Sequence, residues 1–282
     1  MGQGAGEALS LYTPDVLGVF GLEDEEIWGC LGMATEQGVL HRRLPSQDPA
    51  APSGYLIAWP DRRCGVLALV AEGLGRKNPW LESGWPFVLA DEAAEPFAVE
   101  QVTRSADGLQ IVVSGCWRGL RVSFFDVTGQ ARELAEPNQY LPVAVSGWAL
   151  RAKRIDATST RLRAAELQPD VRAALSHGMT PSGEIDIHMD GFAALFAADS
   201  GPSPLFHACG RVESVRPLVC ALEGVKLWSC ALKVRRDIET GRETRLTVHV
   251  SNAVWPAGAP EVGQTLEALV WIQGAIHMDN RD

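Results

Sequence analysis

The clearest structural signal in this chain is the stretch Trp228–Val250, WSCALKVRRDIETGRETRLTVHV. Apolar and polar residues alternate from Trp228 to Val234 and again from Leu246 to Val250. Successive side chains of a β-strand point to opposite faces, so this alternation predicts two strands that each bury one face. Glu239-Thr240-Gly241 supplies a turn between them. The stretch therefore predicts an antiparallel hairpin.

The same pattern recurs through the rest of the chain. Residues 55–59 and 66–70 flank a six-residue loop, and residues 109–114 and 120–124 flank a second turn. Leu266–Ile276 is apolar on both faces, which predicts a central strand. Sheet is therefore expected to dominate the fold.

Helical signals are fewer. Thr13-Pro14-Asp15 has the form of a helix start, and residues 22–33 fit either a helix or a strand. Pro169–His177, which is followed by Gly178, predicts a helix, and Asp190 could cap a short one over residues 192–196. Together these signals predict an α+β protein made mainly of antiparallel sheet.

The 282 residues leave room for more than one unit, and changes in composition suggest where the units meet. Residues 1–97 would form an acidic N-terminal α+β unit, and residues 98–198 a middle β unit with a helical segment. Asp199–Pro204 holds a glycine and two prolines, which is typical of a linker. Residues 205–282 would then form a C-terminal β unit.

The C-terminal unit resembles an OB-like small β-barrel in the order of its elements. A strand containing Gly210–Val215 precedes the hairpin, and Ala259–Gly263 leads into the closing strand. The resemblance implies a barrel, and the usual ligands of such a barrel are oligonucleotides or oligosaccharides.

The middle unit shows a loose likeness to the C-terminal unit. Val99–Val102 resembles Val212–Val215, and each is followed by a hairpin and a strand that carries a tryptophan, Trp148 or Trp271. A second pair of similar segments, Ile187–Asp190 and Ile276–Asp279, has a different spacing. A duplicated β unit is one hypothesis, and two unrelated units are the other.

The net charge of −10 at pH 7 is concentrated in the N-terminal third, above all at Glu23, Asp24, Glu25 and Glu26. Such a cluster is typical of a solvated face or of the first turn of a helix, where carboxylates favour the helix dipole. The alternative is a docking surface for a basic protein partner.

A nucleic-acid partner is not expected for a chain of this charge, because phosphate binding normally requires a basic surface. The compact basic run is formed by Lys233, Arg235 and Arg236, opposite Arg242 and Arg245. Acidic residues interleave with these positions and cancel much of their field: Asp237, Glu239 and Glu243.

The best metal candidate is the alternating set Glu184, Asp186, His188 and Asp190. On a strand these side chains share one face, and carboxylates with an imidazole suit a divalent ion. The alternative is an edge strand with one solvated face.

Other signals of chemistry are weak. The chain lacks a nucleophile elbow, a P-loop and a dinucleotide-binding glycine pattern, so no cofactor is expected. Its six cysteines are widely spaced and are interpreted as free thiols, although Cys220 and Cys230 could face each other across a hairpin. Trp80 and Trp85 could line a ligand groove, and the alternative is that they anchor the core.

Apolar runs fall short of a bilayer span, and no export signal follows Met1, so the chain is expected to be cytoplasmic with no membrane partner. High Ala, Gly and Arg usage suggests a GC-rich bacterial genome. The resulting hypothesis is a non-catalytic cytoplasmic bacterial protein that binds another protein, in an immunity- or adaptor-like role. The alternative is an enzyme, or a small-ligand or metal-binding protein, whose site is assembled from scattered residues.

Overall fold

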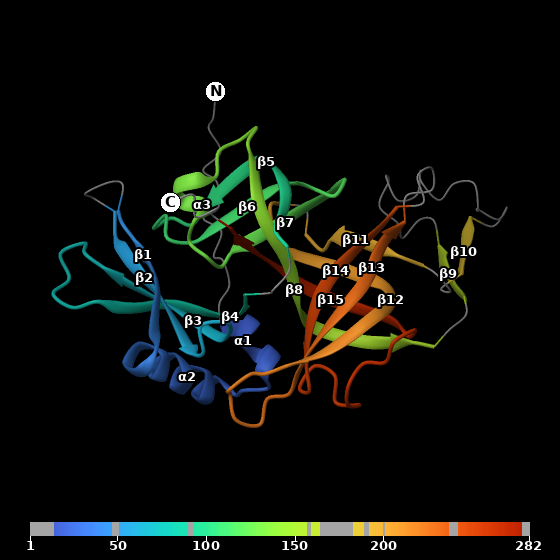
Figure 1. Ribbon diagram of the computed structural model, residues 1–282, viewed down its shortest axis with the longest axis horizontal. Coiled ribbons are helices and arrows are strands. Elements are labelled where there is room, and N and C mark those ends of the chain that lie inside the picture. Colours follow the sequence, from blue (N-terminus) through green and yellow to red (C-terminus); the bar gives the residue numbers. More distant parts are fainter. Residues whose placement is uncertain are drawn as a thin grey trace.

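The computed structural model describes residues 14–46, 51–89, 93–156, 159–163, 183–188, 192–199, 201–236 and 242–277. Most of these residues lie in β-strands, arranged in antiparallel and mixed sheets with short helices beside them (Figure 1). The predicted α+β class with mainly antiparallel sheet is confirmed. No helix within the described ranges has the length and apolar content needed to cross a membrane.

The N-terminal part forms a four-stranded antiparallel sheet with helix α2 packed on it (Figure 1). Helix α2 spans Asp24–Gln37, so the ambiguous residues 22–33 are mainly helical. It buries Ile27, Leu31 and Ala34, which share one side of the helix because they recur at spacings of four and three. Two short helices, α1 (Pro14–Leu17) and the 3-10 helix η1 (Gly18–Phe20), precede it, and the strands in sheet order are β1 (Val39–Leu44), β2 (Ser53–Pro60), β3 (Cys64–Glu72) and β4 (Trp80–Val88).

A larger sheet contains nine strands in the order β11-β12-β13-β14-β8-β15-β7-β6-β5. Three of the sequence-predicted segments, the hairpins at 109–124 and 228–250 and the strand at 266–276, belong to it. Its elements are β5 (Glu95–Arg104), β6 (Ile111–Trp117), β7 (Leu120–Asp126), helix α3 (Ala131–Leu134), β8 (Tyr140–Ile155), β11 (Ala194–Ala197), β12 (Leu205–Leu218), β13 (Leu227–Arg236), β14 (Glu243–Ser251) and β15 (Thr265–Ile276). A separate two-stranded sheet pairs β9 (Ser159–Arg163) with β10 (Glu184–His188).

Two further ladders, β8–β5 and β12–β15, close the nine-stranded sheet into two rings. The first ring contains β5, β6, β7, β15 and β8, and the second ring contains β12, β13, β14, β8 and β15. Each ring has one parallel pairing, at β7–β15 in the first and at β14–β8 in the second. This repeated strand order agrees with the hypothesis of a duplicated β unit. The similar segments at Ile187 and Ile276 are not part of the repeat, because Ile187 lies on β10 and Ile276 ends β15.

Strands β8 and β15 belong to both rings and pair with each other in antiparallel fashion. Trp148 of β8 lies directly opposite Trp271 of β15 in this ladder. One strand of the second ring, β8, therefore comes from the predicted middle unit. Residues 205–282 supply β12, β13, β14 and β15, but these strands do not close the ring alone.

Two apolar cores hold these parts together. One fills the rings, and the other lies between the rings and the N-terminal sheet. In the second core the Trp85 ring meets the Phe125 ring edge to face at 4.7 Å between centroids, and Phe125 contacts Trp271 at 5.1 Å. The buried Gln273 amide donates to the Val88 carbonyl at 3.0 Å and so joins β15 to β4. The N-terminal sheet and the rings thus share a core.

The segment predicted as a linker, Asp199–Pro204, lies between two paired strands. Strands β11 and β12 are antiparallel, with Ala197 opposite Phe206, and the Ala198 amide donates to the Leu205 carbonyl at 2.9 Å. The described part of the segment is therefore the turn of a hairpin. The short helix predicted over residues 192–196 is wrong, because Ala194–Ala197 forms strand β11. The predicted helix Pro169–His177 lies outside the described residues.

Candidate functional site

The acidic cluster forms the N-terminus of α2. Glu23 is the N-cap residue, and its amide donates to Glu26 Oε2 at 2.9 Å while its side chain accepts from the backbone of Glu26. This reciprocal pair satisfies amides that the first helical turn would otherwise leave unbonded. Glu23 and Glu26 therefore have a structural role, and Asp24 and Glu25 remain as exposed carboxylates in the same turn.

An exposed tryptophan follows the acidic turn. The Trp28 residue is 58% exposed, at the edge of the side of α2 that buries Ile27 and Leu31. Residues three and four apart on a helix are neighbours, so Trp28 lies next to Asp24 and Glu25. We call Asp24, Glu25 and Trp28 the acidic–aromatic face. Trp28 is not among the residues predicted from the sequence, although its spacing of three and four from Glu25 and Asp24 places it beside them once residues 22–33 are taken as a helix.

The helix leaves open space around this tryptophan. Gly29 follows Trp28, Gly32 lies about one turn further along the helix, and a methyl group built on either glycine would meet nothing within 4 Å. A partner side chain could therefore approach the indole ring closely. Trp28 is also of a residue type that is enriched among the energetically dominant contacts of protein interfaces.

The structural role of the cap can be measured separately from binding. We expect Glu26→Ala to lower the free energy of unfolding by about 1 kcal/mol, because it breaks the reciprocal cap of α2. Asp24→Ala should change it by less than about 0.5 kcal/mol, since Asp24 is exposed and is not part of the cap. Urea denaturation at neutral pH measures both. Equal losses for the two variants would contradict the assigned roles.

A cavity of about 400 Å³ lies where the N-terminal sheet meets the second ring. We call it the junction cavity. Its volume is within the range of small-molecule sites. The lining comes from the β2–β3 turn, the ends of β3 and β4, the end of β12, and strands β13 and β14: Asp61, Arg63, Cys64, Val88, Leu89, Arg216, Pro217, Leu218, Val219, Ser229, Thr247 and His249.

A serine and a histidine meet at the junction cavity. Ser229 Oγ and His249 Nδ1 are 3.0 Å apart, and the two residues are cross-strand partners in the β13–β14 ladder. His249 is fully buried against Trp148, and burial, with a smaller effect of Arg216, lowers the pKa of His249 to about 3. A general base works best with a pKa near the working pH. An imidazole with so low a pKa is a poor base for activating the Ser229 hydroxyl at neutral pH.

The two tryptophans that were considered for a ligand groove, Trp80 and Trp85, lie in different surroundings. Trp85 is 1% exposed and packs against Phe125 in the shared core. Trp80 lies at the start of β4, where the Arg76 guanidinium stacks 4.2 Å from its ring and its Nε1 donates to Glu82. Trp85 therefore anchors the core, which is the alternative considered from the sequence, whereas Trp80 makes polar contacts at the start of β4.

The residues considered for a metal site lie at the β9–β10 sheet. Glu184, Asp186 and His188 alternate along β10, as the sequence predicts, and Asp190 lies outside the described residues. The positions opposite Glu184 and Asp186 on β9 are arginines, Arg163 and Arg161. Within the described ranges, no group of three or more His, Cys, Asp or Glu is placed to hold a metal ion.

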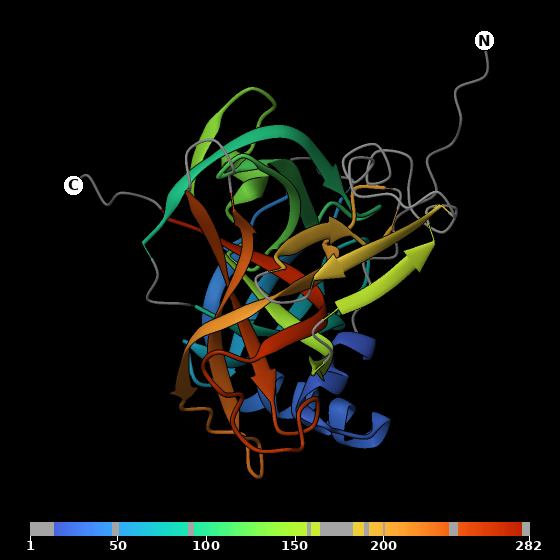
Figure 2. The ribbon, with the colours of Figure 1, turned by 90° about the vertical axis from the view of Figure 1, so that its right-hand side faces the viewer.

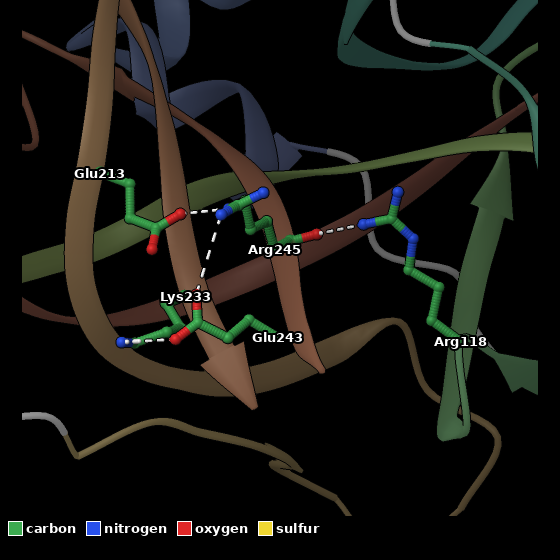
Figure 3. A network of polar contacts seen from close by, with 5 residues as sticks. All are labelled: Arg118, Glu213, Lys233, Glu243 and Arg245. Carbon is green, nitrogen blue, oxygen red and sulfur yellow. Dashed lines mark hydrogen bonds and ion pairs between the residues drawn. The ribbon is translucent and has the colours of Figure 1, made fainter. Parts of the chain in front are cut away.

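The basic residues of the β13–β14 hairpin take part in a polar network that joins the two rings (Figure 3). Lys233 pairs with Glu243 at 3.1 Å, and Arg245 pairs with Glu213. The network continues into the first ring, where Arg118 donates to the Arg245 carbonyl at 3.2 Å and also pairs with Glu95. Lys233 and Arg245 thus neutralise carboxylates of the same chain, and Arg235 donates to the Gly119 carbonyl instead.

Comparison of the chain with protein-family models, with curated proteins and with solved structures found no match. The acidic–aromatic face and the junction cavity are the two candidate sites of this chain.

Proposed function

We propose that this chain is a non-catalytic, cytoplasmic bacterial protein that binds a basic protein partner, in an immunity- or adaptor-like role. The observation that carries the proposal is the acidic–aromatic face, in which Trp28 is 58% exposed beside Asp24 and Glu25. Carboxylates attract a basic partner over distance, and an indole ring supplies apolar contact area once the partner has docked.

The rigidity of α2 supports this choice. The helix is capped at Glu23 and packs on the N-terminal sheet through Ile27, Leu31 and Ala34. It contacts α1, and both helices are blue in the lower part of Figure 2. A surface on a packed helix loses little conformational entropy when it binds. The negative net charge of the whole chain adds a long-range attraction for a basic partner.

The two kinds of side chain in the face are expected to affect binding differently. Asp24→Lys combined with Glu25→Lys should slow association about tenfold at low salt, because the steering charge is reversed. Trp28→Ala should mainly speed dissociation, by about tenfold or more, because it removes an apolar contact. A partner captured by the wild-type protein and then purified allows both rates to be measured by biolayer interferometry at several salt concentrations.

A matched control separates this surface from net charge. Glu223→Lys combined with Glu261→Lys makes the same change in charge at two other exposed glutamates, and it should leave dissociation unchanged. The proposal fails if the Asp24/Glu25 variant and Trp28→Ala both bind the same partner with wild-type rates and the same salt dependence. Circular dichroism of each variant confirms that α2 is retained.

A second candidate, a small-ligand-binding protein, is favoured by the junction cavity. Its volume of about 400 Å³ and its lining by Asp61, Arg63 and Arg216 would suit a small polar molecule. Native mass spectrometry of the purified protein distinguishes the two candidates. A small molecule held in stoichiometric amount, and lost in Arg216→Ala, would favour this alternative.

A further inference from the structure

A row of polar side chains crosses the outer face of the second ring at the junction cavity. Arg216 of β12 lies opposite Ser229 of β13, and Ser229 lies opposite His249 of β14. We call these three residues the polar row, and directly opposed residues of neighbouring strands share one face of a sheet. The next row, which packs in the apolar core of the rings, consists of Val215, Cys230 and Val248. The polar row therefore faces out of the ring, and all three of its members line the cavity.

The polar row has an exposed cation at one end and a buried imidazole at the other. Arg216 is exposed, Ser229 is 4% exposed and His249 is fully buried. Ser229 Oγ lies 3.0 Å from His249 Nδ1, but His249 Nε2 has no hydrogen-bond partner among the described residues. A buried polar nitrogen without a partner costs free energy, so a hydrogen-bonding group of a ligand beside His249 would recover that cost.

The charges of the cavity favour an anion. Its lining carries two arginines, Arg63 and Arg216, against one carboxylate, Asp61. Asp61 accepts a hydrogen bond from the Arg63 amide at 2.6 Å within its own turn. Within the described ranges, no carboxylate forms an ion pair with Arg216. The exposed end of the polar row thus presents a cation that the described part of the chain does not neutralise.

The walls of the cavity add apolar surface beside this cation. Val88 is the last residue of β4 and Leu89 follows it, and Leu218 is the last residue of β12. All three line the cavity, whose volume is about 400 Å³. A site with a positive end and apolar walls fits an anion that carries a hydrocarbon body.

We propose that the junction cavity binds a small amphipathic carboxylate, with its carboxylate group on the polar row and its hydrocarbon body against the apolar walls. The planar Arg216 guanidinium pairs with the carboxylate at the exposed end. The neutral His249 imidazole donates to it from Nε2, and the Ser229 hydroxyl donates to Nδ1. Ser229 thus selects the imidazole tautomer that the ligand requires. The inference takes up the second candidate function and does not depend on the acidic–aromatic face.

The test uses the full-length protein with octanoate as the probe and octanamide as its uncharged analogue. By isothermal titration calorimetry, octanoate should bind at least about tenfold more tightly than octanamide, because the amide cannot form the ion pair with Arg216. The affinity should also rise about fourfold for each methylene group from butanoate to octanoate, because the added carbons are buried against the walls. Equal binding of octanoate and octanamide, or no octanoate binding at about 10 mM, overturns the proposal.

Variants of one strand provide a matched comparison. Arg216→Ala should weaken octanoate binding at least about tenfold, because it removes the cation of the polar row. Arg211→Ala removes another exposed arginine of β12 that lies outside the cavity lining, and it should leave the affinity unchanged. Wild-type affinity in Arg216→Ala, or equal losses in the two variants, contradicts the assignment.

The role of Ser229 has its own readout. Nitrogen-15 NMR of the octanoate complex should show the His249 proton on Nε2, and Ser229→Ala should reduce the population of that tautomer. A proton on Nδ1 in the wild-type complex rules out the proposed contact. Trp28→Ala should bind octanoate as the wild type does, so a failure of the partner surface and a failure of the carboxylate site are distinguishable.

Discussion

A fragment comprising residues 205–282 is expected to be unfolded on its own. It contains β12, β13, β14 and β15, but the second ring also needs β8, which pairs with both β14 and β15. Without β8, two strands that are interior in the intact protein would become open edges, and the apolar interior of the ring would be exposed. Far-ultraviolet circular dichroism and urea denaturation measure the result.

The matched control is a fragment of residues 93–282, which contains every strand of both rings. We expect it to retain a β-type spectrum, with lower stability than the intact protein because the face that packs on Trp85 is uncovered. Proteolysis within Asp199–Pro204 should likewise leave the two pieces associated. A cooperative unfolding transition in the isolated 205–282 fragment would show that this segment is an independent domain, as its composition suggests.

Acid is expected to destabilise the protein through His249. This side chain is fully buried and neutral, and its pKa of about 3 in the folded protein lies well below the usual value near 6.5. Between these two values the unfolded chain binds a proton that the folded chain does not bind. The free energy of unfolding should therefore be highest above pH 6.5 and fall as the pH decreases towards 3.

The size of this effect follows from the one proton involved. His249 alone should remove about 1.4 kcal/mol per pH unit, or up to roughly 5 kcal/mol across the whole window. Urea denaturation from pH 7.5 to 4 measures the slope. His249→Gln should be less stable than the wild type at pH 7, because it disturbs packing on Trp148, and it should show a flatter slope. Equal slopes, or an imidazole titration near pH 6.5 by NMR, would refute the prediction.

Local features of the fold were predictable because they depend on neighbouring residues. Alternation plus a turn identified the hairpin of β13 and β14, and the apolar run at residues 266–276 identified β15 as central. The acidic run at Glu23–Glu26 agrees with the cap of α2. Strand periodicity and helix capping each depend on residues within a few positions of one another, so both can be predicted from the order of residues in the chain.

The role of the turn between β11 and β12 could not be predicted from local sequence. Its glycine and prolines end an element in the same way whether the next element belongs to a new domain or to the returning strand of a hairpin. Only the pairing of Ala197 with Phe206 distinguishes the two cases. The candidate site has the same limit, because the exposure of Trp28 depends on which side of α2 meets the sheet.

The amino-acid pattern alone established a mainly antiparallel β protein with an acidic N-terminal third, because alternation and charge are properties of the linear chain. Tertiary structure decided that the two rings share β8 and β15, and it brought the N-terminal sheet to the Ser229–His249 pair at the junction cavity. The strands β8 and β14, which pair with each other in the second ring, lie far apart in the chain. Such pairings form because the whole molecule buries its apolar surface, and no local preference encodes them.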